Sequence, residues 1–114
     1  MTREEILGME AGRELDALIL EYVFNDCDYH GDYLITVEER DFHPSTDIKA
    51  AWEVREWITE NIGGMKIINV CDELPEYCDI WNGKEYIEAQ GLTAPEAICK
   101  AALLAMNAIN GGLK

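Results

Sequence analysis

Positively charged residues are scarce in this sequence. It has 9 lysine and arginine residues against 23 aspartate and glutamate residues, so its formal net charge is −14 at pH 7. Affinity for nucleic acid and for anionic membranes depends on Lys and Arg contacts, so we expect no direct binding to either. The acidic residues occur in every segment, which is typical of a solvated surface. An array that mimics DNA phosphates and occupies a DNA-binding protein is the alternative.

Long apolar runs are absent too. None approaches the ~20 residues that a membrane-spanning helix needs, and residues 1–8 lack the basic and apolar parts of a secretion signal. Four cysteines occur at irregular spacings, without the paired short spacings of a structural zinc site. We therefore expect a cytoplasmic protein with reduced, mostly buried thiols.

Catalytic motifs are missing as well. The sequence contains two histidines, His30 and His43, and no nucleophile elbow, glycine-rich phosphate loop or zinc-protease motif. Carboxylates are so numerous that no pair of them stands out. We predict that the protein is not an enzyme, has no catalytic residue and uses no cofactor.

One acidic turn resembles a calcium-binding loop. Asp26, Asp28 and Asp32 are closely spaced around a glycine, as oxygen ligands of a hard cation would be. The pattern fails at His30, where a further oxygen ligand belongs, and at Val37, where a glutamate belongs. We interpret the loop as a polar surface turn and predict no metal site.

The composition is that of a folded domain. Hydrophobic residues make up 48% of the chain and there are three tryptophans, which excludes disorder. A chain of 114 residues has the size of one domain, so we expect a single domain over residues 1–114.

Three main helices are predicted, over residues 12–24, 46–62 and 94–109, from apolar residues at helical spacing between capping signals. In the central one, Ser45 or Thr46 is the expected N-cap. It carries two tryptophans, so we expect it to be the core element on which the other segments pack. Capping boxes at residues 2–5 and 93–96 mark a short first turn and the start of the last helix.

The sheet is predicted from three segments. Residues 65–71 have the β-branched content of a strand, and residues 33–37 form a possible short strand. Asn82-Gly83 favours a hairpin over residues 77–90 with a two-residue turn that pairs Trp81 with Lys84. Alternation then places Cys78, Ile80, Ile87 and Ala89 on one face and Tyr77, Asp79, Trp81, Tyr86 and Glu88 on the other. Both faces carry large apolar groups, as in a sheet covered on both sides.

These elements predict an α+β fold: a small three-layer α-β-α sandwich with a short, mainly antiparallel sheet. Helix N-termini such as Ser45–Asp47 offer free N–H groups to an anion, and aromatic rings can stack a base or a sugar. The candidate ligand-binding residues are Ser45, Thr46, Asp47, Arg55, Trp81, Lys84 and Tyr86. Ordinary capping and core packing are the alternative reading of these features.

Three segments together resemble a known family. They are TREEILGMEAGRELDALILEYV at residues 2–23, FHPSTDIKAAWEV at residues 42–54 and TAPEAICKAALLAM at residues 93–106. In their order along the chain and in their residues, they resemble the phage ABA sandwich domain family of small phage and prophage proteins. The resemblance implies a bacteriophage origin, action in the cytoplasm of the infected bacterial host and a layered α-β-α fold. It implies no catalytic residues.

From this resemblance and the lack of catalytic motifs, we expect a phage-encoded, non-catalytic binder of a small nucleotide-like ligand. It would act as a sponge for a host immune signal, such as a cyclic oligonucleotide or an ADP-ribose derivative. We also expect a homo-oligomer, because pockets between subunits bury more of a polar ligand. Two alternatives stay open: an acidic inhibitor of a host nucleic-acid-binding protein, and an accessory or structural phage module without a small ligand.

Overall fold

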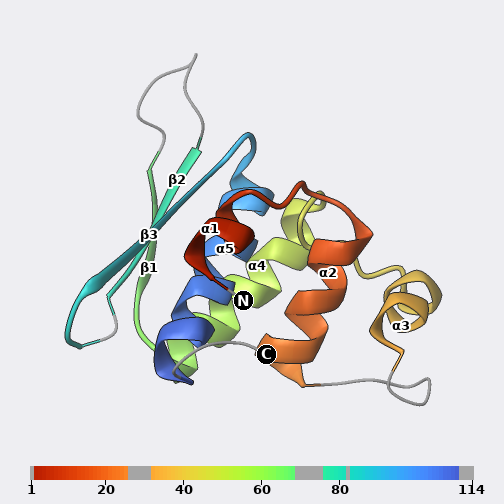
Figure 1. Cartoon of the computed structure of the whole chain (residues 1–114), viewed down its shortest axis with the longest axis horizontal. Coiled ribbons are helices and arrows are strands. Elements are labelled where there is room, and N and C mark those ends of the chain that lie inside the picture. Colours follow the sequence, from red (N-terminus) through yellow and green to blue (C-terminus); the bar gives the residue numbers. More distant parts are fainter. Residues whose placement is uncertain (1, 26–31, 69–75, 82, 111–114) are drawn as a thin grey trace.

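The computed structural model describes residues 2–25, 32–68, 76–81 and 83–110, and it contains helices beside one antiparallel sheet (Figure 1). The elements in chain order are α1 (Arg3–Leu7), α2 (Arg13–Ile19), the π-helical turn η1 (Leu20–Phe24), α3 (Tyr33–Arg40), α4 (Ile48–Asn61), β1 (Met65–Ile68), β2 (Glu76–Trp81), β3 (Tyr86–Gly91) and α5 (Ala94–Ile109). The predicted α+β class is confirmed. None of the described helices has the length and apolar character that a membrane crossing requires.

Helix α5 is the centre of the molecule. It packs against β2 and β3 on one side and against α1, α2 and α4 on the others, and Figure 1 shows it between the sheet and helices α2 and α3. Its alanines at 97, 101, 102 and 105 are buried, and these small side chains allow close approach of its neighbours. The expectation that the segment around residues 44–64 is the central element was therefore wrong, because a helix that is apolar on all sides is buried deepest.

Helix α4 follows the predicted central helix with two corrections. Its N-cap is Asp47, whose side chain accepts a hydrogen bond from the Lys49 N–H at 3.1 Å, rather than Ser45 or Thr46. Its core face carries small and branched residues, while Trp52 is 46% exposed. The two tryptophans of this helix therefore do not both belong to the core.

The N-terminal helices agree well with the sequence. The capping box of α1 is present, with the Thr2 hydroxyl accepting from the Glu5 N–H at 3.1 Å and the Glu5 carboxylate accepting from the Thr2 N–H at 3.2 Å. The helix predicted over residues 12–24 is found as α2 followed by η1, so only its last turn departs from α-helical geometry.

Residues 33–37 form part of helix α3, so the predicted short strand there was wrong. Asp32 caps this helix by accepting from the Ile35 N–H at 3.1 Å. Val37 is fully buried and packs with Ala17 and Leu20 of the preceding helical segment. Packing against α2 thus overrides the β-propensity of a sequence rich in branched residues.

The sheet has the order β1-β2-β3 with antiparallel neighbours. Trp81 pairs with Tyr86, not with Lys84, so four residues rather than two connect the hairpin strands. The register differs from the prediction by two residues, and a shift of two keeps every side chain on its predicted face. The predicted division of the hairpin into two faces therefore holds in spite of the wrong turn.

Only one face of the sheet is covered by described helices. Cys78, Ile80 and Ala89 are buried beneath α5. On the opposite face Trp81 is 44% exposed and Tyr86 is 67% exposed. The cover on both sides that the apolar residues suggested is therefore not found within the described part of the chain, and the rings of Trp81 and Tyr86 lie open to solvent.

The free edges of the sheet can be assigned from two hydrogen bonds. The Trp81 N–H donates to the Gly64 carbonyl at 3.2 Å, which directs the main chain of Trp81 toward β1. Main-chain N–H and C=O groups alternate in direction along an antiparallel strand. Those of Tyr86, Glu88 and Gln90 in β3 therefore point away from β2, toward the free edge. The Arg3 Nη2 accordingly donates to the Glu88 carbonyl at 3.3 Å from outside the sheet.

Candidate functional site

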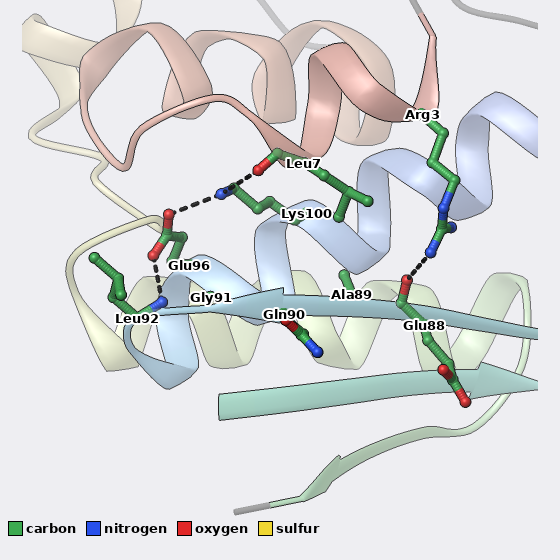
Figure 2. A pocket seen from close by; sticks show the side chains of 9 residues that line it. All are labelled: Arg3, Leu7, Glu88, Ala89, Gln90, Gly91, Leu92, Glu96 and Lys100. Atoms are coloured by element: carbon green, nitrogen blue, oxygen red, sulfur yellow. Dashed lines mark hydrogen bonds and ion pairs between the residues drawn. The ribbon is translucent and has the colours of Figure 1, made fainter. Parts of the chain in front are cut away.

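A cleft lies between α1, the free edge of β3 and the first turns of α5 (Figure 2). We call it the α1–β3 cleft. Its volume is about 440 Å³, within the range of ~300–1,000 Å³ that is usual for sites of small ligands. The lining residues are Arg3, Leu7, Glu88, Ala89, Gln90, Gly91, Leu92, Glu96 and Lys100.

A buried ion pair forms one wall of the α1–β3 cleft. The Lys100 Nζ lies 2.8 Å from Glu96 Oε1, and the side chains are only 6% and 7% exposed. The same ammonium group donates to the Leu7 carbonyl at 3.0 Å, while Glu96 Oε2 accepts from the Leu92 N–H at 2.7 Å (Figure 2). Glu96 thus reaches beyond the capping position predicted for it. Both buried charges are paired and hydrogen-bonded, as buried charges must be.

The positive charge of the cleft comes from Arg3. The carboxylate of Glu88 points away from the Arg3 guanidinium, and only its main-chain carbonyl accepts from it (Figure 2). Because Glu96 neutralises Lys100, Arg3 is the basic lining residue whose charge no lining carboxylate balances. A cleft with this charge suits an anionic group on a ligand.

Gly91 sets the width of the cleft where β3 meets α5. A Cβ atom at this position would lie 2.6 Å from the Ala97 nitrogen and 2.9 Å from the Glu96 Cβ. These distances are shorter than any normal contact, so a side chain here would push the end of β3 away from α5. Glycine is therefore required by the close approach that forms this part of the cleft.

A second hollow of about 600 Å³ lies beside the start of α4. It contains Phe24 and Phe42, whose rings meet edge to face with centroids 5.8 Å apart. Its charged lining residues are Arg40, Asp41, Asp47, Lys49 and Glu53. Three carboxylates against two basic groups leave this hollow net negative, which makes it less suited to an anion than the α1–β3 cleft.

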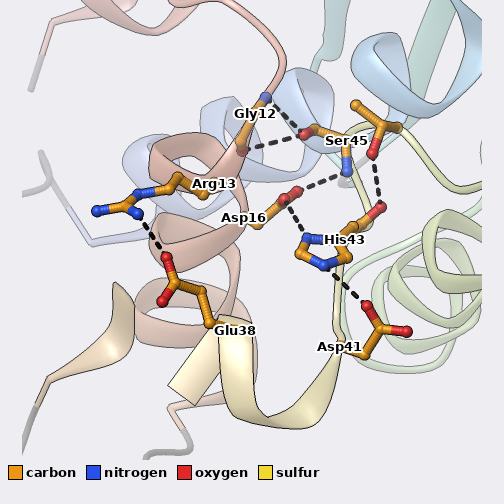
Figure 3. Close-up of polar contacts among 8 residues, drawn as sticks. Gly12, Arg13, Asp16, Glu38, Asp41, His43 and Ser45 are labelled. Carbon is orange, nitrogen blue, oxygen red and sulfur yellow. Dashed lines mark hydrogen bonds and ion pairs between the residues drawn. The ribbon is translucent and has the colours of Figure 1, made fainter. Parts of the chain in front are cut away.

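A polar network ties α2 to the segment before α4 (Figure 3). Asp16 is fully buried; its Oδ1 accepts from the Ser45 N–H at 2.8 Å, and its Oδ2 lies 3.4 Å from the His43 Nδ1. The His43 Nε2 lies 3.0 Å from Asp41 Oδ1. The Ser45 hydroxyl accepts from the Gly12 N–H at 2.9 Å and donates to the Gly12 carbonyl at 3.2 Å. It contacts the main chain rather than the imidazole, so this serine, histidine and aspartate hold the fold and do not form a nucleophilic triad.

The predicted ligand-binding residues do not form one pocket. Ser45 and Thr46 lie beside Thr93, at the N-terminal end of α5. Lys84 lies beside Ile109, at the other end of the same helix. A helix of 16 residues is ~24 Å long, so these two groups lie at opposite ends of α5.

Several of these residues have structural partners. Ser45 is buried and its hydroxyl is hydrogen-bonded to the main chain of Gly12, and Asp47 caps α4, as described above. The Arg55 guanidinium lies 4.8 Å from the centre of the Trp52 ring and donates to the Met65 carbonyl at 3.2 Å. Trp81 and Tyr86 are brought together, with ring centroids 4.8 Å apart on the open sheet face. This aromatic pair is the part of the prediction that retains a surface for a ligand.

Sequence reasoning missed Arg3, Glu96 and Lys100. A signal was available for two of them, because Glu96 and Lys100 are the charged residues of an otherwise apolar helix at the i, i+4 spacing of an ion pair. No such sequence signal marks Arg3, because its partner Glu88 is 85 residues away in the chain.

Metal ligation and thiol chemistry find little support in the described residues. Within them, no three His, Cys, Asp or Glu side chains gather as a metal site would require. Residues 26–31 of the calcium-like turn at residues 26–32 lie outside the described residues, as does Cys71, while Asp32 caps α3. Cys78 and Cys99 are free and buried. Burial, with a smaller effect of Asp79, raises the pKa of Cys78 to about 12, and burial raises that of Cys99 well above its usual value. Both are unreactive as thiolate nucleophiles at neutral pH.

Comparisons with known proteins agree with the architecture. Among curated proteins, none matches this chain. Among solved structures, a phage protein from Bacillus cereus ATCC 14579, known from a 2.0 Å crystal structure, superposes with a TM-score of 0.64 at 22% sequence identity, over 86% of this chain and 93% of that chain. That similarity shows a shared fold. The family model of the phage ABA sandwich domain matches residues 4–103, so the chain belongs to the phage ABA sandwich domain family.

Proposed function

We propose that this phage protein is a non-catalytic binder that holds a small anionic ligand of the nucleotide type in the α1–β3 cleft. The observation that carries the proposal is the position of Arg3. In a chain with a net charge of −14, a guanidinium lies at a cleft of about 440 Å³ whose other charges are paired or turned away. Binding and sequestering a nucleotide signal of the bacterial host, such as a cyclic oligonucleotide or an ADP-ribose derivative, would be the biological role.

The aromatic pair on the sheet supports a nucleotide over a plain anion. Tyr86 is two residues before Glu88 on β3, a distance of ~7 Å along a strand, and it is 67% exposed. A ligand with its phosphate on Arg3 would cross the free edge of β3 to place a base on Tyr86 and Trp81, which lie on the sheet face opposite α5. Base stacking on such rings contributes ~1–3 kcal/mol per base.

The lining of the cleft supports binding without turnover. Its nine residues include no serine, threonine, cysteine or histidine. Its carboxylates are not free to act as a general base, because Glu96 is paired with Lys100 and Glu88 points away. A bound ligand would therefore be held rather than converted. Action in the host cytoplasm and assembly into a homo-oligomer, which would close this open cleft further, are parts of the same proposal.

Thermal unfolding of the purified protein with a panel of cyclic dinucleotides, cyclic trinucleotides and ADP-ribose derivatives tests the proposal. A ligand that binds only the folded state adds ~2.7 kcal/mol of stability at a hundredfold excess over its dissociation constant. We expect a shift with one nucleotide class and recovery of that nucleotide intact, with sedimentation reporting the oligomeric state.

Two arginine variants locate the site. Arg3→Ala should lower the affinity for the active nucleotide about tenfold or more, because a charge-assisted hydrogen bond contributes ~1.5–3 kcal/mol. Arg13→Ala is the matched control, since Arg13 is also exposed but pairs with Glu38 outside the cleft. Equal affinities in the two variants, a hydrolysed nucleotide, or the absence of any shift would each overturn the proposal.

A further inference from the structure

We infer that the α1–β3 cleft recognises its ligand through the main-chain N–H groups of Glu88 and Gln90 on the free edge of β3. The ligand would then present two oxyanion groups ~7 Å apart, the spacing of every second residue in a strand. This inference rests on the proposed function and specifies which groups of the protein bind the ligand.

The direction of these N–H groups follows from independent contacts. The Trp81 N–H donates to the Gly64 carbonyl on the β1 side of β2. Trp81 pairs with Tyr86, so the main-chain N–H groups of Tyr86, Glu88 and Gln90 point toward the free edge of β3. The bond from Arg3 to the Glu88 carbonyl, made from outside the sheet, agrees with this assignment. Both Glu88 and Gln90 line the cleft. No described strand lies beyond β3 on this side.

The same row of N–H groups already binds an oxyanion. Leu92 is the next alternate position after Gln90, and its N–H donates to the Glu96 carboxylate at 2.7 Å (Figure 2). A ligand oxyanion on the Gln90 N–H would continue this arrangement toward Arg3. The edge of β3 therefore has the geometry for carboxylate-like or phosphate-like oxygens, with one position filled from within the protein.

Side chains on this strand do not block such a ligand. In Figure 2 the side chains of Glu88 and Gln90 point away from α1, and the intervening Ala89 is buried. Recognition by the main chain depends on the spacing of the acceptor groups and not on the identity of residues 88 and 90. Phosphates on neighbouring nucleotides of an oligonucleotide have a comparable spacing, which connects this inference with a nucleotide ligand.

Proline substitution tests the role of one N–H directly. Gln90→Pro removes the outward N–H but no hydrogen bond of the β2–β3 ladder, and proline is tolerated at such edge positions. Gln90→Ala is the matched control, because it removes the side chain and keeps the N–H. With the 5′-phosphorylated dinucleotide pApA as the probe in calorimetry, we expect Gln90→Pro to weaken binding by about 10- to 100-fold. Gln90→Ala should bind within about twofold of the original protein, since its N–H remains.

A measurement on the unaltered protein removes any dependence on how the proline variant folds. In NMR titration with pApA, the amide protons of Glu88 and Gln90 should shift downfield and exchange more slowly with solvent. AMP, with a single phosphate, should bind more weakly than pApA, and adipate shows whether two carboxylates satisfy the same groups.

The outcomes distinguish a failure of main-chain recognition from a failure of the proposed function. If the original protein binds pApA but the folded Gln90→Pro variant binds it equally well, or the two amide protons are unaffected, main-chain recognition is overturned while the binder remains. If the original protein binds no nucleotide of the panel, the proposed function fails, and with it this inference.

Discussion

The buried ion pair of α5 offers the sharpest test of the structure. Lys100→Met replaces the ammonium group by an apolar group of similar length and leaves the Glu96 carboxylate charged and only 7% exposed. Removing one partner of a buried pair costs ~3–5 kcal/mol, because the remaining charge is uncompensated. Since small domains have only ~5–15 kcal/mol of stability, this one change should remove a large fraction of it.

The double variant Lys100→Met with Glu96→Gln should recover part of this loss. The glutamine oxygen can still accept from the Leu92 N–H, which Glu96 accepts at 2.7 Å. What stays lost is the hydrogen bond from Lys100 to the partly buried Leu7 carbonyl, present at 3.0 Å, and a carbonyl left without its partner costs at most ~1–3 kcal/mol. We therefore expect the double variant to be more stable than Lys100→Met alone.

Urea unfolding followed by circular dichroism measures these free energies for the original protein, both single variants and the double variant. Unchanged slopes with urea would show that the same surface is exposed in each case. The coupling energy from this cycle should be at least ~2 kcal/mol. A loss below ~1 kcal/mol for Lys100→Met, or strictly additive single effects, would refute a tightly coupled buried pair.

Three further predictions concern the close approach, the thiols and the polar network. Gly91→Ala should destabilise the protein by ~1–3 kcal/mol in urea unfolding, because its Cβ would lie 2.6 Å from the Ala97 nitrogen; a neutral effect would contradict that geometry. Native Cys78 and Cys99 should resist iodoacetamide at pH 8, as read by peptide mass spectrometry against a urea-unfolded control, because burial raises both pKa values. For the same reason the free energy of unfolding should fall as pH rises from about 9 toward 12: the unfolded thiol ionises in this range while native Cys78, with a pKa of about 12, keeps its proton. Asp16→Ala should cost ~1–3 kcal/mol by leaving the buried Ser45 N–H without its 2.8 Å partner, whereas Asp16→Asn, which keeps an acceptor, should cost less.

The sequence by itself determined the local features of the fold. The predicted capping residues Thr2 and Thr93 each lie directly before a helix, since a cap acts on N–H groups within three residues. The division of the hairpin into faces held as well, because side chains alternate with a period of two along a strand. A register error of two residues cannot change that period.

The tertiary structure decided everything that depends on distant contacts. Residues 33–37 became helical because Val37 packs against α2, and no local propensity reports that neighbour. Likewise, Trp52 is exposed because the buried face of α4 carries small and branched residues instead.

The candidate site also depends on contacts between residues far apart in the chain. Of the seven residues predicted to bind a ligand, Trp81 and Tyr86 meet as an exposed pair, while Ser45 and Lys84 lie at opposite ends of α5. The α1–β3 cleft exists because Arg3 reaches Glu88 and Lys100 reaches Leu7, contacts that span 85 and 93 residues of chain. Spacing in a sequence reports neighbours on one helix or strand, and only packing brings residues this far apart to one surface.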